Sequence, residues 1–76
     1  MTPKETLDRY FLEMRWRCLS LAADLDRVQR AEGASVADDS RLTRLHKAIA
    51  TLTDGKANRA ERVQMIFSDM TPPPTK

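Results

Sequence analysis

The chain has 76 residues and a mass of 8.7 kDa, which leaves room for one small domain. Its 13 Lys and Arg against 11 Asp and Glu give a formal net charge of only +2, so the composition does not favour a nucleic-acid partner. A single cysteine cannot form an internal disulfide and the first ten residues are not a signal peptide, so we expect a cytoplasmic protein. No apolar run approaches the roughly 18 residues of a membrane span, and no membrane association is expected.

A start signal for a helix opens the chain. Thr2 is a capping residue, Pro3 suits the first helical position, and Glu5 completes a capping box. Apolar residues then alternate at spacings of four and three, which is a heptad pattern. We call this row the seam: Leu7, Phe11, Met14, Cys18, Leu21, Leu25 and Val28. The pattern predicts a helix from about residue 3 to residue 32, ended by Gly33.

A second apolar row lies on the opposite side of the same helix when residues are plotted at about 100° each. We call this row the Trp16 stripe: Leu12, Trp16, Leu19 and Ala23. A helix with two apolar sides needs two partners. We therefore predict that the Trp16 stripe is the interface of a homodimer, because exposed apolar stripes mark interfaces and tryptophan often carries interface energy. The competing explanation is that the third helix covers Trp16 within one chain and leaves a monomer.

The second helix is predicted over about residues 39–53, after a short connection at residues 34–38. Its N-cap could be any of four residues: Ser35, Asp38, Asp39 or Ser40. Its apolar face is spaced by three and four: Leu42, Leu45, Ile49 and Leu52. The helix ends at the turn signal formed by Asp54 and Gly55.

The third helix is predicted over about residues 58–68. Asn58 and Glu61 have the spacing of another capping box. The apolar face comprises Ala60, Val63 and Phe67, with Ile66 beside it. Residues 71–76 contain three consecutive prolines and are predicted to be a flexible, extended tail.

Together these elements predict an all-α fold with a single helical domain over residues 1–70. The long first helix would span roughly 45 Å and form an antiparallel helical hairpin with the second helix and the short third helix. The second helix would cover the C-terminal half of the seam, and the third helix would cover its N-terminal half. The seam would then be the core, and the hairpin would assemble into a helical bundle.

No residue pattern indicates a catalytic site, a cofactor or a metal. Cys18 lies in the seam, where we expect a buried structural thiol. His46 has no second His or Cys three or four residues away with which to share a metal. Four aspartates could gather near the hairpin turn: Asp24, Asp26, Asp38 and Asp39. Capping and the helix dipole explain such aspartates better than a cation does.

The function that these patterns favour is a small helical module for protein–protein interaction or assembly, which self-associates through the first helix, could also dock onto a larger protein, and is not an enzyme. The alternative is a nucleic-acid-associated helical protein that uses the basic residues of this helix: Arg9, Arg15, Arg17, Arg27 and Arg30. A strong, salt-dependent affinity for DNA or RNA would distinguish the alternative. A third option is a ligand-binding bundle, which would bind an apolar dye.

Overall fold

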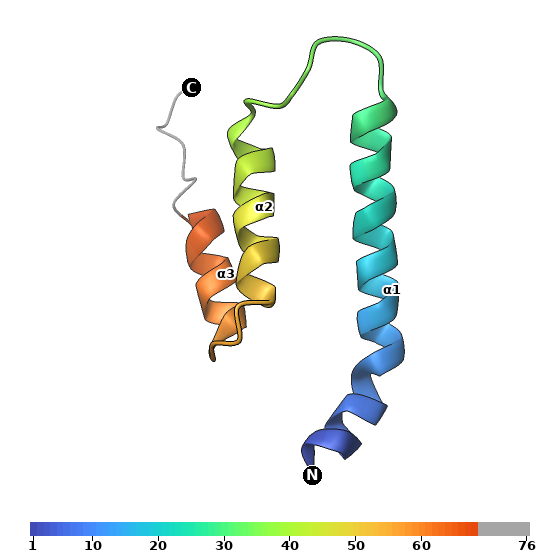
Figure 1. Cartoon of the computed structure of the whole chain (residues 1–76), viewed down its shortest axis with the longest axis vertical. Helices are drawn as coiled ribbons and strands as arrows, with labels where there is room; N and C mark the ends of the chain where they lie inside the picture. The colour runs from blue at the N-terminus through green and yellow to red at the C-terminus, as the bar shows by residue number, and fades with distance from the viewer. Residues whose placement is uncertain (69–76) are drawn as a thin grey trace. The chain divides into compact units, whose positions relative to one another are not determined.

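The computed structural model describes residues 1–68, which contain three α-helices and no strand. In chain order they are α1 (Pro3–Arg30), α2 (Ser40–Leu52) and α3 (Arg59–Ser68), as Figure 1 shows. The all-α fold predicted from the sequence is therefore confirmed. The predicted tail, residues 71–76, lies outside the described residues.

The contacts of the chain divide it into two units, Met1–Gly33 and a second unit that begins at Ala34. The first unit contains α1, and the second contains α2 and α3. We expect one domain over residues 1–70 from the sequence, and the packing of α1 on the other two helices stays a prediction. Each unit is described by itself below.

The N-terminus of α1 carries the capping box that the sequence predicts. The Glu5 N–H donates to Thr2 Oγ1 at 3.1 Å, and the Thr2 N–H donates to Glu5 Oε1 at 2.8 Å. Pro3 is the first helical residue. Hydrogen bonds from the backbone and the side chain of Thr2 favour the charged form of Glu5 and lower its pKa. The start of α1 is thus fixed by residues that lie next to one another in the sequence.

The C-terminus of α1 lies earlier than the sequence predicts. The helix ends at Arg30, and Ala31 is extended, with φ −63° and ψ 142°. Gly33 follows with φ +126°, a conformation that other residues rarely adopt. The glycine therefore redirects the chain after the helix has ended, and it is not the residue that ends it.

The second unit is a pair of helices in contact, α2 and α3, which lie side by side in Figure 1. Asp39 is the N-cap of α2, because its carboxylate accepts the Arg41 N–H at 2.8 Å. Asp39 is thus the N-cap among the four candidates that the sequence leaves open. The Arg41 guanidinium also donates to this carboxylate, and these bonds lower the pKa of Asp39 to about 2.

The small core of this unit centres on Ala48 of α2, which is 6% exposed. Two apolar residues of α3, Val63 and Ile66, are half-buried, whereas Phe67 is 37% exposed. The apolar face of α3 is therefore turned from the one predicted, with Ile66 in the more protected position instead of Phe67. The sequence pattern allowed both, since Ile66 and Phe67 lie three and four residues after Val63.

Arginine side chains bind the turn between the two helices and join the helices at their other end. At the turn, Arg62 donates to the carbonyl oxygens of Ala57 and Lys56 at 2.9 and 3.0 Å, and pairs with the Asp54 carboxylate at 2.6 Å. At the other end, Arg44 of α2 donates to the carbonyl oxygen of Ile66 at 2.8 Å. That carbonyl belongs to the last turn of α3, where a cation is favourable.

The turn between α2 and α3 differs from the predicted capping box. Asn58 has φ +61°, a left-handed conformation, whereas an N-cap residue is usually extended. Its carbonyl oxygen accepts the Arg62 N–H at 3.0 Å, the first bond of α3. A left-handed turn at Asn58, held by the side chain of Arg62, thus replaces the predicted box of Asn58 and Glu61.

Candidate interaction surface on the first helix

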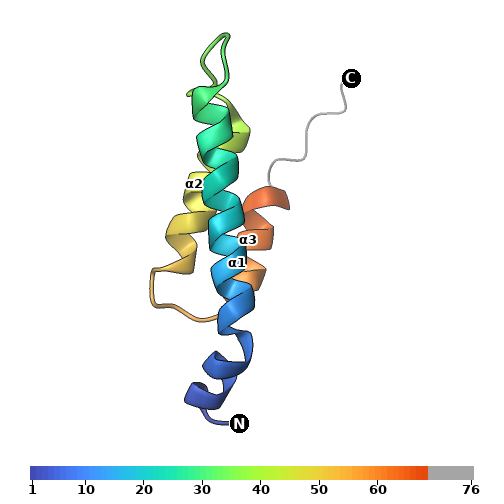
Figure 2. The ribbon, with the colours of Figure 1, turned by 90° about the vertical axis from the view of Figure 1, so that its right-hand side faces the viewer.

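The Trp16 stripe is exposed along the middle of α1, a single continuous helix in Figures 1 and 2. Leu12, Trp16 and Leu19 are 68%, 66% and 51% exposed, and Ala23 is half-buried. Trp16 combines the largest apolar side chain of the helix with a central position in the stripe. The competing explanation, in which α3 covers Trp16 within one chain, concerns the packing of the two units and stays a prediction.

The seam on the opposite side of α1 is also exposed. Its ends are the most accessible, with Leu7, Phe11 and Val28 at 52%, 51% and 46%, whereas Leu21 and Leu25 are half-buried. Cys18 is exposed in the same way. Neighbours three and four residues away cover only part of a helical side chain, so the burial expected for this thiol needs a second element and stays a prediction.

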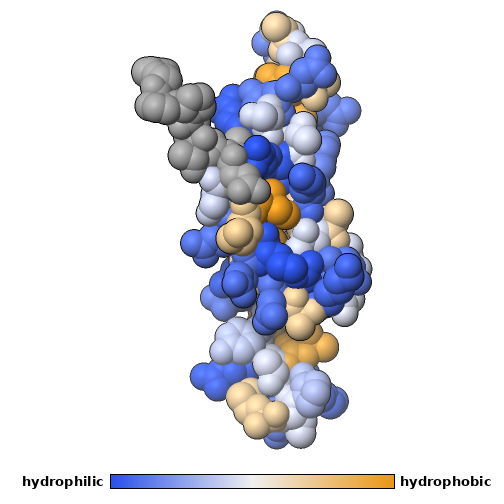
Figure 3. All heavy atoms as spheres, turned by 90° about the vertical axis from the view of Figure 1, so that its left-hand side faces the viewer, coloured by the Kyte–Doolittle hydropathy of each residue, from blue (hydrophilic) through white to orange (hydrophobic). Residues whose placement is uncertain are grey.

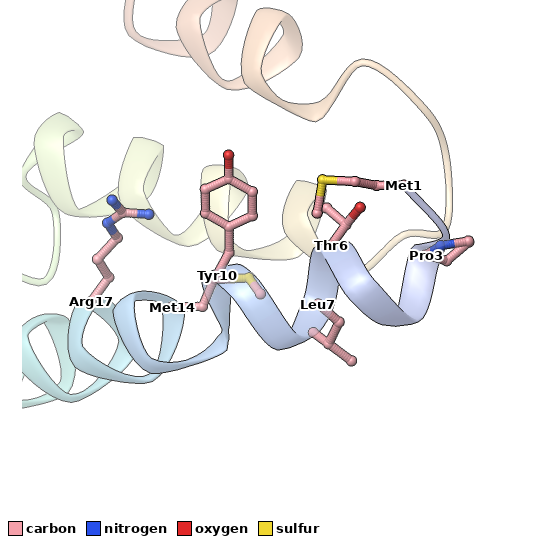
Figure 4. Close-up of a pocket in the computed structure, with 7 residues that line it drawn as sticks. All are labelled: Met1, Pro3, Thr6, Leu7, Tyr10, Met14 and Arg17. Carbon is pink, nitrogen blue, oxygen red and sulfur yellow. The ribbon is translucent and has the colours of Figure 1, made fainter.

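Tyr10 adds to this apolar surface and was missed by the sequence pattern. It is 46% exposed and lies three residues after Leu7 and four before Met14, beside the seam. Together with N-terminal residues it lines an open groove on α1 (Figure 4): Met1, Pro3, Thr6, Leu7, Tyr10, Met14 and Arg17. The spacing of Tyr10 from Leu7 was the available signal, but its hydroxyl placed it outside a purely apolar row.

Six charged residues of α1 are paired within the helix. Three ion pairs join residues three or four apart: Lys4 with Asp8 at 3.1 Å, Glu13 with Arg17 at 3.6 Å, and Asp24 with Arg27 at 2.6 Å. Such pairs stabilise a helix by only a few tenths of a kcal/mol. These six charges nevertheless have partners within α1, whereas the seam and the Trp16 stripe have no element to pack against on α1 itself.

The arginines of α1 do not form one basic patch. At about 100° per residue, Arg9, Arg15 and Arg17 lie on three different sides of the helix. Arg17 and Arg27 are paired with acidic residues, and the Arg9 guanidinium lies 5.9 Å from the centre of the Tyr10 ring. This distribution lacks the clustered positive charge that a nucleic-acid surface needs.

Among residues 1–68 there is no group of three or more His, Cys, Asp or Glu side chains that could hold a metal ion. His46 is exposed on α2. Two of the four aspartates named above have local roles: Asp24 pairs with Arg27, and Asp39 caps α2. None of the helices in this part of the chain combines the length and apolar character needed to cross a membrane.

Comparison with protein-family models, with curated proteins and with solved structures gave no match. The candidate surface is therefore defined by α1 alone, with the Trp16 stripe on one side and the seam on the other. The assignment of the stripe as an interface and of the seam as a core stays a prediction.

Proposed function

We propose that this chain is a small helical assembly module that forms a homodimer through the Trp16 stripe and has no catalytic activity of its own. The observation that carries the proposal is the exposure of Trp16, at 66%, between two exposed leucines on the same side of α1. Burying a large apolar side chain is worth about 1.5–3 kcal/mol. A second copy supplies the same stripe and buries both at once.

A homodimer suits this surface better than nucleic acid, because the central contact is apolar and the arginines are spread around the helix. Docking onto a larger protein would use the same stripe. We also propose a cytoplasmic location, since Cys18 is an exposed free thiol and such thiols persist in reducing compartments.

The test is sedimentation equilibrium of the full chain at about 0.1 mM, where a micromolar dimer is nearly fully formed. The wild type should be a dimer. Trp16→Glu should be a monomer that keeps its α-helical circular dichroism, because two carboxylates at the centre of an apolar interface would cost several kcal/mol.

Arg15→Gln is the matched control. It removes one unit of positive charge, as Trp16→Glu adds one of negative charge, but Arg15 lies about 100° away from Trp16 around the helix. The control should remain a dimer. A wild-type monomer at this concentration, or a dimer that Trp16→Glu leaves intact, would contradict the proposal.

A further inference from the structure

Charged residues continue the Trp16 stripe at both of its ends. Steps of three and four lead from Leu12 back to Arg9 and Glu5, and from Ala23 forward to Asp26 and Arg30. At about 100° per residue, all four charged positions lie within roughly 50° of the centre of the stripe. From its N-terminal end, the extended stripe therefore carries a negative charge, a positive charge, four apolar residues, a second negative charge and a second positive charge.

These end charges differ from the charges on the polar sides of α1. Arg9, Asp26 and Arg30 are exposed, and none of them forms an ion pair within the described chain, residues 1–68. Glu5 already accepts the Thr2 N–H. Arg9 and Asp26 are thus the charges in line with the stripe that are most available to a partner.

We propose that the second copy binds the Trp16 stripe in antiparallel orientation, with the two-fold axis between Trp16 and Leu19. This inference rests on the proposed dimer and adds its orientation and register. In an antiparallel pair with this axis, Arg9 faces Asp26 of the second copy, and Glu5 faces Arg30. All of these pairs share one midpoint in the sequence, between residues 17 and 18.

A parallel, in-register dimer would bring like charges together in place of opposite charges. Each charged residue would then face its own counterpart, so Arg9 would lie opposite Arg9 and Asp26 opposite Asp26. Like charges that face each other destabilise an interface, and complementary ones select the orientation. The charge order of the stripe is complementary to itself only when one copy is turned end to end.

The apolar residues fit the same register. In the antiparallel pair Trp16 lies opposite Leu19 and Leu12 lies opposite Ala23, so every layer combines a larger residue with a smaller one. A parallel pair would stack the two tryptophans in one layer and the two alanines in another. Layers of similar total side-chain volume fill the space between two helices without voids, and this favours the antiparallel arrangement.

The test is charge reversal, with the dimer dissociation constant measured by sedimentation equilibrium at low salt. Arg9→Glu and Asp26→Arg should each raise the Kd about tenfold, because each places like charges together at both ends of the dimer. The double variant Arg9→Glu with Asp26→Arg should return the Kd to near the wild-type value. Within one helix these two positions are about 25 Å apart, beyond the reach of screened charges, so the recovery requires a second copy.

The outcomes separate the orientation from the dimer itself. A wild-type dimer whose single variants bind as well as the wild type, or whose double variant fails to recover, overturns the antiparallel register and leaves the proposed function standing. A wild-type monomer overturns both.

Disulfide trapping gives a second measurement that does not depend on the reversed charges. Arg9→Cys and Asp26→Cys are each made with Cys18→Ser, and the chains are oxidised alone and mixed. The antiparallel dimer should form a disulfide between the two variants when mixed, because position 9 of one copy faces position 26 of the other. Each variant oxidised alone should stay largely uncrosslinked, since its two cysteines lie about 25 Å apart. Crosslinking of each variant with itself would instead indicate a parallel dimer.

Discussion

The two units of this chain differ in how far apart in the sequence their bonded side chains lie. In α1, the side-chain hydrogen bonds and ion pairs are local, between residues three or four apart, as in the Thr2 cap and the Glu13–Arg17 pair. In the second unit, Arg44 donates to the carbonyl oxygen of Ile66, 22 residues away. The comparison shows that local bonds define where a helix starts, while an interior requires a second helix.

The consequence is a difference in what each unit leaves exposed. Ala48 is buried in the α2–α3 unit. Figure 3 shows one face of the whole chain, which is mostly hydrophilic, with apolar side chains in small patches. In contrast, α1 exposes Trp16 and Phe11 on opposite sides. The α2–α3 unit also exposes Leu52 and Met65, at 50% and 58%, but more of the exposed large apolar side chains belong to α1. The unit without an interior of its own therefore has the larger apolar surface to offer a partner.

The largest effect is expected at the core of the second unit. Ala48→Glu places an unpaired carboxylate at its most buried position, and such a charge costs about 3 to 5 kcal/mol, enough to unfold a two-helix unit. NMR chemical shifts should lose the helical signature of α2 and α3. Ala50→Glu is the matched control, because Ala50 is exposed on the same helix. If both variants stay folded, Ala48 is not the centre of the unit.

Ala48→Glu also tests whether the dimer formed by α1 depends on the second unit. The Trp16 stripe lies wholly on α1, so Ala48→Glu should leave the dimer seen by sedimentation intact. Loss of the dimer together with α2 and α3 would mean that α1 depends on the second unit for its association.

A smaller effect is expected from the arginine that joins the ends of α2 and α3. Arg44→Met keeps the length of the side chain but removes its hydrogen bond to Ile66, and a hydrogen bond from a charged donor is worth about 1.5–3 kcal/mol. Amide exchange should accelerate in α3. Lys47→Met makes the same change in charge at an exposed position of α2 and should have little effect. Equal exchange rates in the two variants would show that the bond contributes nothing.

The capping box of α1 should have a local effect of about 1 kcal/mol. Thr2→Ala removes the oxygen that accepts the Glu5 N–H, so the first turn of α1 should fray and its amides should exchange faster. Thr2→Ser keeps a hydroxyl oxygen and should preserve the protection. A first turn that is equally protected in Thr2→Ala would mean that Pro3 and Glu5 suffice to start the helix.

The smallest expected effect concerns the pKa of Asp54, in the turn of the second unit. The Arg62 guanidinium, with the Lys56 N–H, lowers the pKa of Asp54 from 3.8 to about 2. Because the folded-state pKa is the lower one, the stability from this pair is present above pH 3.8 and is lost as the pH falls through 2. An NMR titration of the Asp54 carboxyl carbon should show a midpoint near 2.

Arg62→Gln is the comparison for this titration. It removes the charged partner while keeping a polar side chain, so the midpoint for Asp54 should move up toward 3.8. A wild-type midpoint already near 3.8 would show that the pair does not persist in solution.

Much of this fold was determined by the sequence alone, because its signals are local. The cap at Thr2 and Glu5, the turn at Gly55 and the spacing of apolar residues act over three or four positions, and the helices lie within two residues of their predicted bounds. Both apolar rows of α1 could be recognised in the same way. The charge order that surrounds Trp16 is likewise a property of the sequence.

Only the tertiary structure decided which residues are protected and what joins the helices. The sequence placed Phe67 on the apolar face of α3 with Ile66 beside it, whereas in the pair with α2 Ile66 is the more protected of the two. The burial predicted for Cys18 depends on a second element that α1 does not supply by itself, and it stays a prediction. The bond from Arg44 to Ile66 could not be predicted, because every residue carries a carbonyl oxygen and only the fold selects which one an arginine reaches.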